Sequence, residues 1–517
     1  MNFLLFRFSR EKGRAVLGLC LLSGLLLRGF LVRGGLWRDE AQFLFVLRQP
    51  TILAMLDFLH FHESHPPLFY LFMRLWAALF GEGSILFPSL LFGLILIPLV
   101  YLVGKKVFSA QAGLMAAALV AFSPSLVDSS TSVRPYPLLA ILCLLSTTFL
   151  FRAARDGRRR DWGFYVAATA AMLFVHHWTW LIFGGQWLMF ALSFRHWGRP
   201  KAGLLKGWGI SQVLILLLYS PWLPVLLFQS RHAGYPPRPL LFFLALRMLS
   251  ESAFSLDAGI AALLIALIAF LVLRQKSQTS EKLPYFFFLG VPLIAFAGAV
   301  GLSLRSDLVT SAALGILTPY LLLLFCQLLS RLFQQGKIVP LSILALLILN
   351  NALILRRQAG TFNSNAREVA LAVAARSKAQ DLVAITPECL ASSFNYYYQP
   401  QNRQVTFLGE GRKGAIAWDN YALRLGSPPL PMTACFEKAR QEGRRVWLIV
   451  DSERFVSSLS ERSIERAIEK KNWELLALWR SKQLVEALVD LYGQPQVLPV
   501  SYPRCRKEEL KAFLFSP

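Results

Sequence analysis

The chain has 517 residues, of which 55% are hydrophobic and only 16% are charged, and its formal net charge is +24. A soluble domain carries about 25% charged residues, so this composition excludes an ordinary soluble protein. The positive charge does not indicate a nucleic-acid partner, because no basic module with interleaved aromatic residues is visible and most of the excess falls in short loops between apolar runs.

Long apolar runs in the chain predict an α-helical polytopic membrane protein, since about 20 apolar residues cross a bilayer core. The first run is interpreted as a retained span, because no small-residue cleavage site follows it. The segment 66–80 is apolar but short, carries Arg74 and is interpreted as an interfacial helix; as a span it would move a basic loop outside. We predict about eleven spans, near 14–33, 85–104, 111–127, 134–151, 162–176, 178–194, 208–228, 257–273, 283–303, 309–327 and 338–354.

The distribution of Lys and Arg predicts the orientation of these spans. With eleven spans, the N-terminus and alternate loops hold about 20 basic residues, whereas the other loops hold about nine over a longer sequence. Cytoplasmic loops carry the excess of Lys and Arg. We therefore predict a multi-pass protein of the plasma (inner) membrane with a cytoplasmic N-terminus, a cytoplasmic loop at Arg158–Arg160 and a C-terminal part outside.

The C-terminal part, 356–517, has charge of both signs and reads as alternating helices and strands. AREVALAVAARS and LSERSIERAIEKKNW predict helices, while DLVAIT, QVTFLG and RRVWLIVD predict strands, and PECLASSFNYYY starts a helix with proline in its first turn. This alternation predicts a small extracytoplasmic α/β domain after a transmembrane domain at 1–355. One disulfide among Cys389, Cys435 and Cys505 is left open.

The loop at 34–84, predicted to lie outside, gathers acid–base groups next to the membrane. Isolated loop carboxylates are often only solvated, but here a tryptophan precedes the acidic pair and a histidine–proline pair follows. Ionisable groups at a membrane surface are costly without a function. The candidates are Arg38, Asp39, Glu40, His60, His62, Glu63 and His65.

Two other segments predicted to lie outside carry matching groups. Arg134 and Tyr136 stand at the start of a span, and an arginine at that depth pairs with an acid or a phosphate. His176 and His177 lie at a turn; they fit the same site or an interfacial belt with neighbouring tryptophans. Arg28, in the first span, either snorkels or serves the same anionic group. Together these residues suit an anionic lipid substrate and a hydroxyl nucleophile that needs a general base.

Three motifs in this order, WRDEA, HPPLFY and RPYPLL, resemble the multispanning C-type (GT-C) glycosyltransferases, in particular the protein O-mannosyltransferase and aminoarabinose transferase group. The resemblance covers residues 14–200 best and weakens up to 355. The family transfers a sugar from a polyprenyl-phosphate carrier to an acceptor outside the cytoplasm. A departure lies in VTSAALGILTPY, which lacks the Arg-Tyr pair that relatives often carry in a late span.

The resemblance implies roles for single residues. Asp39 would take the proton of the acceptor hydroxyl, and Glu40 would orient the acceptor or Arg38. His65 and Arg134 would contact the carrier phosphate, whose developing negative charge fixed cations stabilise. One base and a phosphate leaving group imply a single displacement with inversion.

Two other functions compete with the transferase. A transporter or flippase of a lipid-linked saccharide would place ionisable groups near the bilayer midplane and show repeated halves, and neither is visible. The second alternative is a non-catalytic assembly protein with the same fold. The cysteines form no CxxC pair, so we expect no structural zinc; a divalent cation, the sugar and the acceptor (lipid, glycan or protein) are left open.

Overall fold

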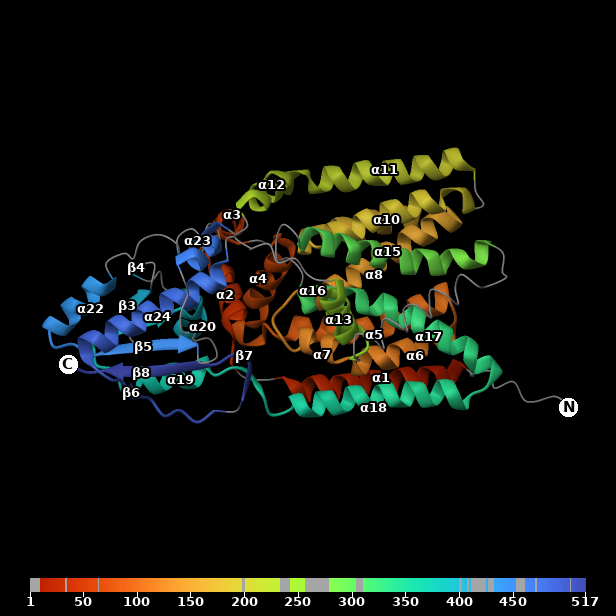
Figure 1. Ribbon diagram of the computed structural model, residues 1–517. Coiled ribbons are helices and arrows are strands. Elements are labelled where there is room, and N and C mark those ends of the chain that lie inside the picture. The colour runs from red at the N-terminus through yellow and green to blue at the C-terminus, as the bar shows by residue number, and fades with distance from the viewer. Residues whose placement is uncertain are drawn as a thin grey trace. The chain divides into compact units, whose positions relative to one another are not determined.

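The computed structural model describes residues 10–32, 35–63, 65–197, 200–232, 242–255, 279–303, 310–398, 402–406, 409–410, 425, 432–451, 461–469, 472–502 and 504–517. The chain divides into two compact units (Figure 1). The membrane unit comprises Met1–Val32, Pro66–Pro224 and Arg238–Ala359. The α/β unit comprises Arg33–His65, Val225–Pro237 and Gly360–Pro517. This division differs from the predicted domains, because the first part of the predicted 34–84 loop belongs with the C-terminal residues.

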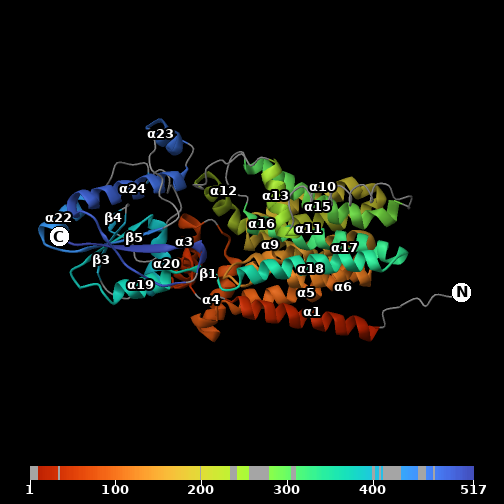
Figure 2. The same cartoon turned by 60° about the horizontal axis from the view of Figure 1, so that its bottom comes forward.

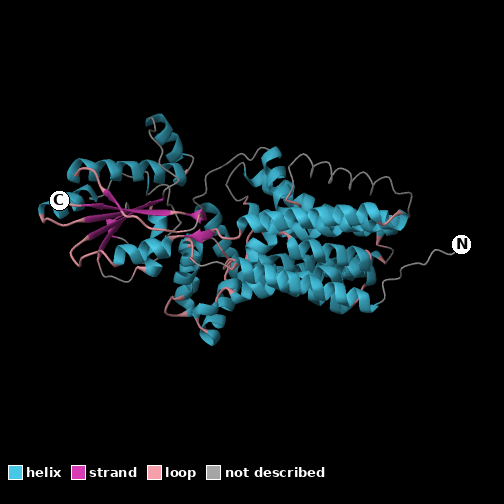
Figure 3. Ribbon diagram, turned by 90° about the horizontal axis from the view of Figure 1, so that it is seen from below, coloured by secondary structure: helices cyan, strands magenta, loops and turns pink. Residues whose placement is uncertain are grey.

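In its described residues the membrane unit is helical (Figure 3). Its helices are α1 (Arg10–Leu31), α4 (Leu68–Phe80), η1 (Glu82–Ser84), α5 (Phe87–Val107), α6 (Ala110–Phe122), α7 (Pro124–Ser130), α8 (Tyr136–Asp156), α9 (Arg159–Val175), α10 (Thr179–Ser193), η2 (Phe194–His196), α11 (Lys201–Tyr219), η3 (Ser220–Trp222), α13 (Phe242–Ala253), α15 (Thr279–Ser303), α16 (Ser311–Leu314), η4 (Gly315–Leu317), α17 (Thr318–Gln335) and α18 (Ile338–Gln358). α12 (Leu223–His232) begins in this unit and continues into the α/β unit.

The multispanning helical fold predicted from the sequence is confirmed. Among the described residues, seven helices are long and apolar enough to cross a membrane, or eight if α6 and α7, bent by 60°, form one span. The predicted spans at 162–176 and 178–194 are helices, but α9 and α10 have only 17 and 15 residues. The predicted span at 257–273 lies outside the described residues. The segment at 66–80 forms the 13-residue helix α4, which is too short to span a bilayer core.

Arg28 of α1 joins the bent pair α6–α7 and does not snorkel. Its side chain is fully buried; Nε donates to Ser130 Oγ at 2.9 Å and Nη1 donates to the carbonyl of Ala121 at 3.2 Å. Pro124 has no N–H for the carbonyl that a continuous helix would offer it, so carbonyls at the end of α6 need other donors. Arg28 supplies one, which explains a buried guanidinium in a span.

Polar side chains buried between helices tie the bundle together. Gln186 of α10 donates to Ser146 at 2.9 Å and to Thr147 at 3.0 Å, both on α8. Tyr320 of α17 shares a hydrogen bond with Thr147 at 2.8 Å and donates to the carbonyl of Cys143 at 2.6 Å. Membrane helices associate through such bonds, since apolar side chains gain little by leaving lipid.

The crossing of α5 and α6 depends on small residues. A Cβ added to Gly113 would lie 2.5 Å from the backbone oxygen of Tyr101, which a helix cannot easily withdraw. We expect Gly113→Ala to lower the free energy of unfolding by about 1–3 kcal/mol, as overpacking does. The exposed Gly163 of α9 has nothing within 4 Å of its added Cβ, so Gly163→Ala is the matched control. Thermal unfolding of both purified variants checks this; equal midpoints would contradict it.

The α/β unit holds all the strands that the structure describes. Its first helices are α2 (Arg38–Leu47) and α3 (Ile52–His62). The C-terminal residues form β1 (Phe362–Ser364), α19 (Ala366–Ala374), β2 (Leu382–Thr386), η5 (Glu388–Leu390), α20 (Ala391–Tyr397), β3 (Arg403–Thr406), β4 (Gly409–Glu410), α22 (Met432–Gln441), β5 (Val446–Asp451), α23 (Glu461–Glu469), α24 (Trp473–Tyr492), β6 (Gln496–Val497), β7 (Cys505–Glu508) and β8 (Leu510–Phe515). The predicted small α/β domain is therefore present.

The central sheet has the order β4-β3-β2-β5-β8-β6, with β3, β2 and β5 parallel and the other strands antiparallel to their neighbours. All five residues of β2 are buried. One face of the sheet packs against α22 and α24, and the other against α19 and α20 (Figure 2). A second, two-stranded parallel sheet pairs β1 with β7. Helices on both faces explain why the strands read as apolar runs.

All six cysteines are free, so no disulfide forms among Cys389, Cys435 and Cys505 in this structure.

Candidate active site

Asp39 lies in the first turn of α2, where Arg38 holds its carboxylate. Nε of Arg38 donates to Oδ1 of Asp39 at 3.1 Å, and both side chains are about one-fifth exposed. An acid in the first turn also meets the positive end of the helix dipole. Asp39 is thus a fixed carboxylate that remains partly exposed.

Glu40 has a different environment, although it is the next residue. It is 3% exposed, and its Oε2 accepts the backbone N–H of Trp37 at 3.3 Å. A glutamate at this position of a helix satisfies a backbone donor that the helix leaves unpaired. The geometry gives Glu40 a role in shaping the start of α2, whereas the Asp39 carboxylate pairs with Arg38 and stays partly exposed.

Residues distant in sequence surround Arg38. Its Nη1 donates to Sγ of Cys389 at 3.6 Å, and burial tends to lower the pKa of its guanidinium. The negative charge of Asp39 and the hydrogen bond to Cys389 outweigh burial and raise that pKa above its ordinary value. Arg38 is therefore a permanent cation beside Asp39.

Helix α2 is held to the C-terminal residues by further hydrogen bonds. The N–H of Leu36 donates to the hydroxyl of Tyr397 at 2.8 Å, and Ser392 donates to Gln42 at 3.2 Å. These contacts explain why residues after the first span fold with the C-terminal α/β sheet and not with the helical bundle.

Glu508 of β7 is a buried carboxyl near this group. It is 5% exposed and accepts hydrogen bonds from Ser364 at 2.7 Å and Ser393 at 2.9 Å. Burial raises the pKa of Glu508 to about 7, although both serines and Arg38 act in the opposite direction. Sequence reasoning missed Glu508 and Cys389, because nothing near them in the chain marks them as neighbours of Arg38.

Glu508→Gln is expected to weaken the pH dependence of stability. The folded protein holds the proton of Glu508 more tightly than the unfolded chain, where the pKa has its ordinary value of 4.5. The free energy of unfolding therefore falls as pH rises from about 4.5 to about 7, by about 3 kcal/mol in total. Unfolding midpoints of the full chain across this window check this. Glu486→Gln, which removes an exposed carboxylate, is the control; equal pH slopes in both variants would contradict the assignment.

Residues 59–65, from the middle of the predicted loop, form another group of contacts in the α/β unit. Nδ1 of His65 lies 3.2 Å from Oε1 of Glu63, whose side chain is 7% exposed. Gln229 of α12 donates to the carbonyl oxygens of Leu59 and Glu63, both at 2.7 Å. His62 ends α3, with its ring 5.2 Å from that of Phe58.

The other predicted site residues belong to the membrane unit. The guanidinium of Arg134 lies 5.7 Å from the ring centre of Tyr136, and that ring lies 6.0 Å from His176. Ser89 of α5 donates to the carbonyl of Arg134 at 3.2 Å. Arg134, Tyr136 and His176 therefore gather where α8 begins and α9 ends.

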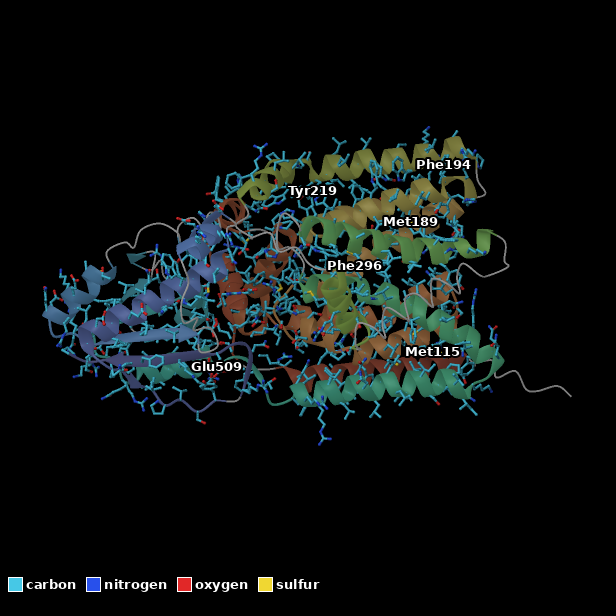
Figure 4. The ribbon with its side chains drawn as sticks, in the orientation of Figure 1. Met115, Met189, Phe194, Tyr219, Phe296 and Glu509 are labelled. Atoms are coloured by element: carbon cyan, nitrogen blue, oxygen red, sulfur yellow. The ribbon has the colours of Figure 1, made fainter. Side chains whose placement is uncertain are left out.

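The two histidines of the turn have separate partners. Nδ1 of His176 accepts the backbone N–H of Trp178 at 3.1 Å. His177 lies 3.5 Å from the hydroxyl of Tyr219, the residue at the end of α11 that Figure 4 labels. The ring of His176 contacts that of Tyr136, and His177 contacts Tyr219 at the end of α11.

One known protein family matches part of the sequence. A family model described as dolichyl-phosphate-mannose-protein mannosyltransferase matches residues 64–224. The match includes Arg134 and both histidines of the turn but begins after Asp39 and Glu40. Comparison of the sequence with curated proteins finds no match.

Solved structures resemble the whole chain. The ArnT of Cupriavidus metallidurans, bound to undecaprenyl phosphate, has a TM-score of 0.59 and 13% identity, with 98% of each chain covered. The oligosaccharyltransferase AglB of Archaeoglobus fulgidus, in complex with an inhibitory peptide and a dolichol-phosphate, has a TM-score of 0.57 and 11% identity, covering 96% of this chain and 74% of AglB. The chain thus has the GT-C fold of multispanning glycosyltransferases, as the resemblance of its motifs predicted.

Proposed function

We propose that the protein is a glycosyltransferase that moves a sugar from a polyprenyl-phosphate carrier to an acceptor hydroxyl outside the cytoplasm. The observation that carries the proposal is Asp39, a partly exposed carboxylate held by Arg38 at the start of α2, in a chain with the GT-C fold. ArnT and AglB, which share this fold, have been solved with polyprenyl-type lipid phosphates. The fold favours the transferase over a transporter.

The proposed reaction is a single displacement at the anomeric carbon. Asp39 accepts the proton of the acceptor hydroxyl while that oxygen bonds to the anomeric carbon, and the bond from this carbon to the phosphate oxygen breaks. The configuration inverts, and the lipid phosphate leaves with its electron pair. Arg134 is proposed to be a cation that stabilises the developing charge, and His65, Tyr136 and His176 are proposed to contact the donor. His62, Glu63 and His177 are proposed to contact the substrates.

No residue is assigned to a divalent cation. Within the described residues, no three His, Cys, Asp or Glu side chains are arranged to hold a metal ion.

The proposed orientation follows from the spans that lead into the α/β unit. Leu31 of α1 and Leu355 of α18 pack into one apolar cluster with Val127, so both helices finish at the same end of the bundle. The chain enters the α/β unit after each of them. With the basic N-terminus inside, the α/β unit lies outside the cytoplasm.

Cysteine labelling in intact cells tests this orientation. In a background with Cys435→Ser, Lys511→Cys is expected to react with a membrane-impermeant maleimide, because this position is exposed on the α/β unit. Arg159→Cys, in the basic turn between α8 and α9, is expected to react only after permeabilisation. Labelling of position 159 in intact cells would overturn the orientation.

Transfer by the purified protein tests the proposed function. In detergent there are no two sides of a membrane, so a transporter or an assembly protein yields no product, whereas a glycosyltransferase moves labelled sugar from a lipid-phosphate donor. Mass spectrometry of envelope lipids, glycans and proteins from cells with and without the protein identifies the acceptor. The proposal is refuted if the purified protein transfers no sugar to any envelope fraction that differs between cells with and without the protein.

A further inference from the structure

The α/β unit contains a pocket at the point where its strand order reverses. The chain leaves β2 for β3 on one side and then reaches β5 on the other side of β2. The connections that follow β2 and β5 therefore leave the sheet in different directions. Open α/β sheets bind ligands in the crevice at the carboxyl ends of such a strand pair. Thr386, Pro387, Val450 and Asp451 line this pocket at the strand ends.

The lining combines charges of both signs with an aromatic wall. Arg38 and Lys507 contribute two cations, and Asp451 and Glu508 contribute two carboxyl groups. Nζ of Lys507 lies 4.9 Å from the ring centre of Trp37, which also lines the pocket. A site built for a lipid phosphate would present cations without facing carboxylates. This balance fits a neutral ligand whose hydroxyls both donate and accept hydrogen bonds.

The pocket is connected to the proposed base through Arg38. The same guanidinium that lines the pocket donates to Oδ1 of Asp39 and to Sγ of Cys389, another pocket residue. A ligand in the pocket therefore meets the side chain that holds the base. Such a position suits the molecule that receives the sugar.

We propose that this pocket binds a saccharide unit of the acceptor, with its hydroxyls paired to Asp451, Lys507 and Arg38. The assignment to the acceptor rests on the proposed function, whereas saccharide binding by the pocket does not. The lining residues Leu390 and Leu478 contact the apolar faces of the sugar ring.

Saturation-transfer NMR on the full chain in nanodiscs tests the proposal, with methyl glycosides of mannose, glucose, galactose and N-acetylglucosamine as probes. At least one is expected to bind, and Asp451→Asn and Lys507→Met are each expected to weaken it about tenfold or more, as loss of a hydrogen bond to a charged group does. The controls, Asp490→Asn and Lys511→Met, make the same charge changes at exposed positions outside the pocket and should bind as the wild type does.

Each possible result of the binding experiment either supports or overturns the proposed saccharide site. The proposal is overturned if no glycoside binds, or if the pocket and control variants bind equally well. It is also overturned if a serine- and threonine-containing peptide, in place of the sugars, shows binding that depends on the pocket. If the wild type transfers no sugar but the pocket variants still lose saccharide binding, the pocket assignment stands and the proposed function fails.

Discussion

Asp39→Asn is expected to lower the rate of sugar transfer by about 10²–10⁴, the usual contribution of a general base. Asparagine keeps the shape of the side chain and can still accept the hydrogen bond from Arg38, which lies 3.1 Å away in the wild type. It cannot take up the proton of the acceptor hydroxyl. The variant should therefore fold and insert normally. Transfer of labelled sugar by the purified variant, with its thermal unfolding midpoint, is the measurement.

Glu40→Gln is the matched control. The Gln side chain keeps an oxygen that can accept the backbone N–H of Trp37, so the start of α2 should persist and transfer should stay near the wild-type rate. Normal turnover in Asp39→Asn with loss in Glu40→Gln would exchange the two roles. Normal turnover in both would remove this helix end from the catalytic site.

Arg134→Ala is expected to lower transfer by about 10²–10³, the range for loss of one group that stabilises charge in a transition state. Arg134 lies at the start of α8, beside Tyr136. Arg134→Lys keeps the charge but loses the planar fork, so it should also be impaired if the phosphate is held by two hydrogen bonds.

His65→Ala should weaken use of the donor in the same assay. Rates measured over a range of donor concentrations separate binding from chemistry.

Arg160→Ala is the control for these variants, since it removes an exposed arginine from the first turn of α9, at the other end of α8. It is expected to transfer sugar at the wild-type rate. Wild-type donor dependence in Arg134→Ala, Arg134→Lys and His65→Ala would exclude both residues from the donor site.

Local sequence pattern alone determined the membrane class, the positions of most spans and the α/β character of the C-terminal part. Apolar length is read along the chain, so α1, α5 and α8 could be placed from their composition. The apolar runs DLVAIT and RRVWLIVD similarly predicted the buried strands β2 and β5. The family motifs also singled out Asp39 and Arg134 as candidate site residues.

Only the tertiary structure decided which of these residues are neighbours. Cys389 and Glu508 stand far along the chain from Arg38, and their placement depends on how the strands and α2 pack together. Equally, two adjacent carboxylates look alike in a sequence, but Glu40 is buried at the start of α2 and Asp39 is partly exposed. Hydropathy and helix signals act over a few residues, whereas burial and hydrogen bonding of a side chain are set by segments that meet only after folding.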